Sequence, residues 1–197
     1  MTDTFRTRCV VFAEHPALPS VAEYGDRHGW RIVSETPPGV PRNAPREIVF
    51  STGQADAAVH LCEDDITQNS YAFAVGGSKD GAEALIGVLE RALPSWSVAR
   101  LLTEVDRGAG FDEKGRALIR LAIAAPKEFD PAVFERVRDC LIHPDERLRA
   151  LAIWATSYTP WPEYRRLLAN VAAEDASKQI RDRAARMFAS FDAEGPF

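Results

Sequence analysis

One short group of residues in this chain has types that could bind a metal ion. His60 and Cys62 lie in a stretch that predicts a β-strand, and Asp64 and Asp65 follow it directly. Alternate residues of a strand share a face, so the imidazole and the thiol would point the same way. Zinc sites take three or four such ligands at regular spacing, whereas the 4 histidines of this chain are scattered along it. We therefore expect no metal site, and we expect His60 and Cys62 to be packed within the sheet.

Motifs for phosphate binding and for nucleophilic catalysis are incomplete. The segment GGSKDG (76–81) has neither the GxxxxGK[ST] nor the GxGxxG spacing. It predicts a turn in which Ser78 or Asp80 caps the following helix. The sequence has no GxSxG elbow and no cysteine in a catalytic context, and the acidic pair at 64–65 predicts a solvated loop. We therefore expect no catalytic residues, no cofactor and no enzyme activity.

The residues best suited to binding are aromatic rings in the second half of the chain. Trp154, Tyr158, Trp161 and Tyr164 lie close together in the sequence, and Arg147 is nearby. Tyrosine, tryptophan and arginine dominate the binding energy of protein interfaces. Two interpretations are open: the rings form a hydrophobic plug between helices, or some of them form a binding surface.

The elements that would position these residues differ between the two parts of the chain. Residues 1–94 predict a small α+β domain, a mainly antiparallel sheet with two helices packed on one face. The turns between its strands include 53–56 and 64–69, and a proline-rich loop covers 36–45. The predicted strands are 7–14, 31–35, 47–52, 57–63 and 71–77, and the predicted helices are 18–30, ended by Gly29, and 80–93.

Residues 95–197 predict an all-helical domain. Short separators divide it into segments with helical periodicity, and brief links between helices favour antiparallel hairpins. The segments are about 97–107, 112–125, 131–142, 145–158, 162–173 and 177–191.

The helical part repeats itself. Residues 111–125 align with 144–158 at an offset of 33, and a further step of 32 aligns Arg149 with Arg181. The offset of 33 also places Arg116 on Arg149. A period in this range, with two helices per unit, is typical of an α-solenoid.

The repeated pattern resembles HEAT-like (armadillo-type) repeats. The segments RVRDCLIHPDERLRALAIWA (136–155) and RRLLANVAAEDASKQIRDRAARMFA (165–189) fit it, whereas LLTEVDRGAGFDEKGRALIRLA (101–122) departs by having Gly115 in place of an aliphatic residue. The resemblance implies about three helix pairs. It also implies that the repeated arginines are structural and pair with acidic residues in a turn or in the neighbouring repeat.

HEAT arrays bind with the face lined by the second helix of each pair. We therefore expect a non-enzymatic protein–protein interaction module, of which an inhibitor or immunity-type protein that blocks a basic toxin or host protein is one form. The alternative is nucleic-acid binding through a stripe of arginines on that face. The candidate residues for a partner surface are Arg120, Arg147, Trp154, Tyr158, Trp161, Arg183 and Arg186.

Charge and composition bear on the choice between these alternatives. The net charge is −5, and residues 1–96 hold 8 Lys and Arg against 13 Asp and Glu, whereas residues 97–197 hold 16 of each. Neither part has the basic excess that drives binding to nucleic acids. The 3 cysteines are far apart, no signal-peptide pattern is present and no stretch has the length of a spanning helix. We expect a cytoplasmic protein without a membrane partner.

Overall fold

The computed structural model describes residues 4–39, 44–53 and 57–193. The chain divides into two compact units, residues 1–97 and 98–197. The boundary expected at residue 94 moves to 97, because β7 (Ser95–Trp96) pairs with β2 (Val10–Phe12) and so belongs to the sheet.

The first unit is α+β, as the sequence predicts, and is built on an antiparallel sheet. Within the described residues its strand order is β3-β4-β5-β6-β2-β7, and β1 pairs with a further part of β6. The strands β1 (Phe5–Arg6) and β7 have two residues each, which is too short for any periodic signal. The remaining strands are β3 (Arg31–Thr36), β4 (Arg46–Ser51), β5 (Ala57–Asp64) and β6 (Asn69–Gly76).

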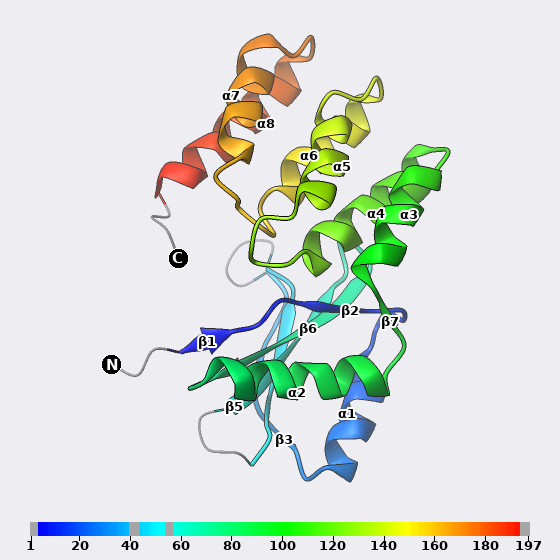
Figure 1. The fold of residues 1–197 in the computed structure, drawn as a ribbon, viewed down its shortest axis with the longest axis vertical. Helices are drawn as coiled ribbons and strands as arrows, with labels where there is room; N and C mark the ends of the chain where they lie inside the picture. The colour runs from blue at the N-terminus through cyan, green and yellow to red at the C-terminus, as the bar shows by residue number, and fades with distance from the viewer. Residues whose placement is uncertain (1–3, 40–43, 54–56, 194–197) are drawn as a thin grey trace. The chain divides into compact units, whose positions relative to one another are not determined.

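Two helices, α1 (Leu18–Arg27) and α2 (Lys79–Ala92), share one core with the sheet. Alternation along the strands places residues such as Ile48 and Phe50 on the side of these helices. Gly29 follows α1 with φ 73°, a left-handed conformation that ends the helix. Figure 1 shows α2 lying across the sheet.

The predicted turns have separate outcomes. Residues 76–81 form a strand-to-helix turn in which the Ser78 hydroxyl accepts a hydrogen bond from the Gly81 N–H at 3.2 Å, so Ser78 is the cap. Most of the turn predicted at 53–56, and residues 40–43 of the proline-rich loop, lie outside the described residues.

The second unit consists of helices over its described residues. Each predicted helical segment corresponds to one helix, and the helices pack as consecutive hairpins (Figure 1). The first helices of the hairpins contact each other in one layer, and the second helices contact each other in another. The helices are α3 (Val98–Arg107), α4 (Phe111–Ala124), α5 (Pro131–Leu141), α6 (Glu146–Ala155), α7 (Tyr164–Glu174) and α8 (Lys178–Ala193).

The glycine that departs from the repeat pattern lies at a close approach of two helices. A Cβ atom at Gly115 of α4 would lie 2.8 Å from Cδ1 of Leu151 of α6. The missing side chain therefore lets the leucine pack directly on the backbone of α4.

Two of the repeated arginines, Arg149 and Arg181, donate to the turn between α7 and α8, whereas Arg116 donates within its own helix. Arg149 forms a two-pronged ion pair with Asp175, at 2.7 and 3.0 Å, in the turn of the following hairpin. Arg181 donates to the backbone carbonyl of Asp175, whereas Arg116 donates to the carbonyl of Asp112 at 3.0 Å. Only Arg149 thus has, in the described residues, the pairing with a neighbouring turn that the resemblance implies.

Within the described residues, none of the helices has the length and apolar character that crossing a membrane requires.

Candidate binding groove

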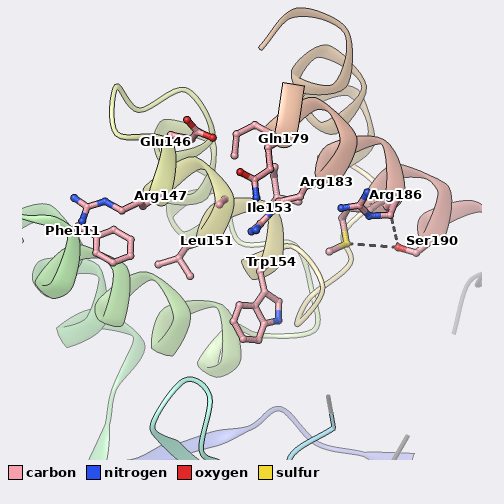
Figure 2. Close-up of a pocket in the computed structure, with 13 residues that line it drawn as sticks. Phe111, Glu146, Arg147, Leu151, Ile153, Trp154, Gln179, Arg183, Arg186 and Ser190 are labelled. Atoms are coloured by element: carbon pink, nitrogen blue, oxygen red, sulfur yellow. Dashed lines mark hydrogen bonds between the residues drawn. The ribbon is translucent and has the colours of Figure 1, made fainter. Parts of the chain in front are cut away.

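A groove lies on the layer formed by the second helices of the hairpins. Its volume is about 820 Å³, within the range of protein sites that bind small molecules or peptide side chains. Figure 2 shows its lining side chains, which come from α4, α6 and α8. They are Phe111, Glu146, Arg147, Ala150, Leu151, Ile153, Trp154, Gln179, Ile180, Arg183, Arg186, Met187 and Ser190.

Helical periodicity explains why these residues meet. On α8 the lining positions recur every three or four residues, so they form a single stripe, and α6 contributes a matching stripe. Ile153 and Ile180 are 3% and 1% exposed and form the floor. Trp154 is half-buried at one end of the groove (Figure 2), so part of its ring is available to a ligand.

The guanidinium of Arg147 contacts both Phe111 and Asp145. Its guanidinium lies 4.3 Å from the ring centre of Phe111 and donates to both oxygens of Asp145 at 2.7 and 3.1 Å. This ion pair lowers the pKa of Asp145 to about 2. The charge of Arg147 is therefore already compensated.

Arg183 and Arg186 of α8 are the exposed cations of the groove. Neither forms a hydrogen bond or ion pair with another described residue, although the charge of Arg186 contributes to lowering the pKa of Asp182. The nearest acid in sequence, Asp182, is instead paired with Lys178 at 2.7 Å. Because an arginine in water retains all its donors, these two side chains are free to bind an anionic group.

The predicted aromatic cluster separates into two parts. Trp161 is 5% exposed, and its indole N–H donates to the carbonyl of Lys127 at 2.9 Å. It stacks on Tyr164, which is 1% exposed, at a ring separation of 5.7 Å. Trp161 therefore belongs to the core, which corrects its inclusion in a partner surface, and the plug interpretation holds for these two rings.

Trp154 and Tyr158 form the other part of the cluster. Their rings stack at a centroid distance of 6.4 Å, and both side chains are half-buried. Trp154 lines the groove, whereas Tyr158 and Arg120 of α4 are not among its lining residues. The structure therefore brings together Arg147, Trp154, Arg183 and Arg186 among the predicted site residues.

The two tryptophans should respond differently to a conservative change. We expect Trp161→Phe to lower the free energy of unfolding by about 1–2 kcal/mol, because the buried indole loses its hydrogen bond and the smaller ring leaves part of the buried site unfilled. Trp154→Phe, the matched control, should have a smaller effect, since the Trp154 side chain is only half-buried. Urea unfolding of the two variants measures the difference. Equal losses of stability would contradict the assignment of Trp161 to the core.

A network of polar residues in the sheet unit was not expected from the sequence. His15 Nδ1 lies 2.8 Å from the Ser70 hydroxyl, and His15 Nε2 lies 3.4 Å from a carboxylate oxygen of Asp65. These are the residue types of a hydrolase triad. However, Ser70 is 0% exposed and its hydroxyl also accepts the N–H of Ala17 at 3.1 Å. A substrate cannot reach the buried Ser70 hydroxyl in this arrangement. The hydroxyl instead accepts a hydrogen bond from the backbone at the start of α1.

The residues considered for metal binding are engaged in packing. His60 Nδ1 lies 2.8 Å from a Glu47 carboxylate oxygen, and its ring stacks on Phe73 at 4.8 Å. Burial raises the pKa of the Cys62 thiol to about 12, which disfavours the thiolate that a metal would need. Among the residues whose positions are described, no three His, Cys, Asp or Glu side chains are grouped to hold a metal ion.

Comparisons of the chain with family models, with curated proteins and with solved structures find no match. The interpretation of the groove therefore depends on its own residues.

Proposed function

We propose that the protein is a non-enzymatic protein–protein interaction module that binds its partner in the groove between α4, α6 and α8. The observation that carries the proposal is the half-buried indole of Trp154 beside an apolar floor, with two exposed arginines on the adjoining helix. This combination of an aromatic anchor, an apolar floor and arginines is typical of binding hot spots.

The helical architecture supports the same function. A stack of helical hairpins with a period near 33 residues is the arrangement that a HEAT-like array would have. Such arrays bind through the layer of second helices, and the groove lies on that layer.

An inhibitor or immunity-type protein is one specific form of this module. Its motivation is the acidic net charge of −5, which would favour a basic partner. At the groove itself Arg183 and Arg186 present positive charge, so the contact there would be with an acidic part of the partner. The acidic sheet unit would supply a second, separate contact.

Nucleic-acid binding has less support than protein binding. Of the predicted arginine stripe, Arg120 lies outside the groove and Arg147 is paired with Asp145. Two remaining cations would make at most about two phosphate contacts, far fewer than the 6–10 that give DNA-binding proteins their affinity.

The test is an affinity capture from a lysate of the source organism, with and without nuclease, read by mass spectrometry. Wild-type protein is compared with Trp154→Ser and with Ile142→Ser, which removes an apolar side chain that is 72% exposed in the turn after α5. We expect a protein partner that survives nuclease, is retained by Ile142→Ser and binds Trp154→Ser about 30-fold or more weakly. Capture of nucleic acid alone, or of a partner that is indifferent to Trp154, would overturn the proposal.

A further inference from the structure

We infer that the groove receives a short amphipathic helix whose apolar face covers the groove floor and whose acidic residues contact Arg183 and Arg186. This inference rests on the proposed function and specifies the chemistry of the partner segment.

The groove favours a helix because its walls are helices. The backbone groups of α6 and α8 are used within those helices, so an extended peptide would find no strand edge to pair with. An extended backbone laid on Ile153 and Ile180 would lose water without gaining hydrogen bonds, which costs free energy. A helix bonds its own backbone internally and presents only side chains to the floor.

The length of the groove limits the length of the segment. The lining residues of α6 run from Glu146 to Trp154, which at 1.5 Å per residue is about 12 Å. Two to three turns of helix cover this distance. Apolar residues of the partner at positions i, i+3 or i+4, and i+7 would then form one contact face.

The distribution of charges along the groove favours one orientation of the bound helix. Arg183 and Arg186 lie one turn apart on α8, whereas Glu146 lies near the start of α6 (Figure 2). The Glu146 carboxylate accepts a hydrogen bond from the Ser177 hydroxyl at 2.7 Å. Acidic residues of the partner are favoured beside the two arginines and disfavoured beside Glu146. We therefore expect the acids to be concentrated toward one end of the segment.

A selection from a random library tests this chemistry without knowledge of the natural partner. The library displays helical peptides of about 18 residues in which acidic, basic and neutral residues are equally represented at every position. It is selected on the full-length protein, and clones that lose binding to Trp154→Ser are retained as groove binders. We expect these clones to be net acidic and to carry apolar residues at helical spacing.

The affinity of the best clone is then measured by fluorescence anisotropy on charge variants. We expect Arg183→Gln and Arg186→Gln each to weaken binding about tenfold. The control Arg138→Gln also removes one positive charge, on α5, and should leave the affinity unchanged. Binding should weaken as salt increases from about 50 mM to about 500 mM.

The possible outcomes separate this inference from the proposed function. Groove clones that are neutral or basic, or that bind both arginine variants with wild-type affinity, overturn the inference and leave groove binding intact. The absence of any clone that depends on Trp154 overturns the inference as well. The proposed function is then decided by the lysate capture alone, where the Trp154→Ser comparison is independent of the partner's charge.

Discussion

Replacing Arg149 by alanine is expected to lower the free energy of unfolding by about 2–3 kcal/mol. The Arg149 and Asp175 side chains are only 13% and 7% exposed. The guanidinium also donates to the carbonyls of His143 and Pro144 at 2.9 and 3.0 Å. The variant therefore removes the cation that pairs with the largely buried Asp175 carboxylate and the donor to the two carbonyls. Removing only one partner of a buried ion pair is strongly destabilising, because the other charge stays buried without compensation.

Urea unfolding followed by circular dichroism measures this loss, and hydrogen exchange locates it. The control is Arg138→Ala, which removes the same charge from a pair with Asp139 whose side chains are 42% and 64% exposed. That change should cost less than about 1 kcal/mol. If the two variants are equally stable, the pair of Arg149 with Asp175 stabilises the protein no more than a surface ion pair does.

The stabilisation by this pair should depend on pH in a defined direction. The hydrogen bonds from Arg149 lower the pKa of Asp175 below its ordinary value. A carboxylate whose pKa is lowered on folding stabilises the protein above its unfolded pKa, about 3.9, and loses that contribution as the pH falls through the folded value. The stability difference between wild type and Asp175→Asn should thus be full at pH 7 and shrink below about pH 4. A difference that grows on acidification would contradict the ion pair.

The second large effect is expected at Glu63 in the sheet unit. The side chain is buried, at 4% exposure, and its Oε1 accepts the backbone N–H groups of Ala17 and Leu18 at 3.0 and 2.8 Å. Its Oε2 lies 3.7 Å from His15 Nδ1. The N-cap of α1 is Ala17, which has no side-chain acceptor of its own, so a residue of β5 caps the helix from across the unit.

We expect Glu63→Ala to lower the free energy of unfolding by about 2–3 kcal/mol, because charge-assisted hydrogen bonds to a helix start are lost inside the core. Glu63→Gln keeps one acceptor and should lose about half as much. The control Glu23→Ala removes a carboxylate of α1 whose side chain is 74% exposed and should change stability by less than about 0.5 kcal/mol. Hydrogen exchange of α1, measured with urea unfolding, distinguishes the variants. Unchanged protection of α1 in Glu63→Ala would show that the cap is dispensable.

Much of the fold could be predicted from the sequence because its signals are local. Runs of β-branched and apolar residues bounded by turn residues predicted the five longer strands, and helical periodicity with short separators predicted each helix of the second unit. The cap of α2 was predicted as Ser78 or Asp80, because capping residues lie within a few positions of a helix start, and the structure shows Ser78. The two-residue strands β1 and β7 were missed because pairing with β6 and β2, rather than any pattern of their own, creates them.

The candidate site could be predicted only in part. The sequence indicated that second helices would line the binding face, and Arg147, Trp154, Arg183 and Arg186 do lie on the groove. It did not distinguish Trp154 from Trp161, since both belong to one short cluster of aromatic residues. The buried donor bond of Trp161 to Lys127 separates them.

The sequence by itself determined the longer elements of this protein, their order and the repeat of the helical part, because residues a few positions apart encode them. The tertiary structure decided which polar and aromatic groups are already engaged. Trp161 bonds a residue 34 positions away, Arg149 one 26 positions away, and Ala17 one 46 positions away. Such partners come together only when separate elements pack. The pair of Arg147 with Asp145 is by contrast local, because the two residues are two positions apart at the start of α6.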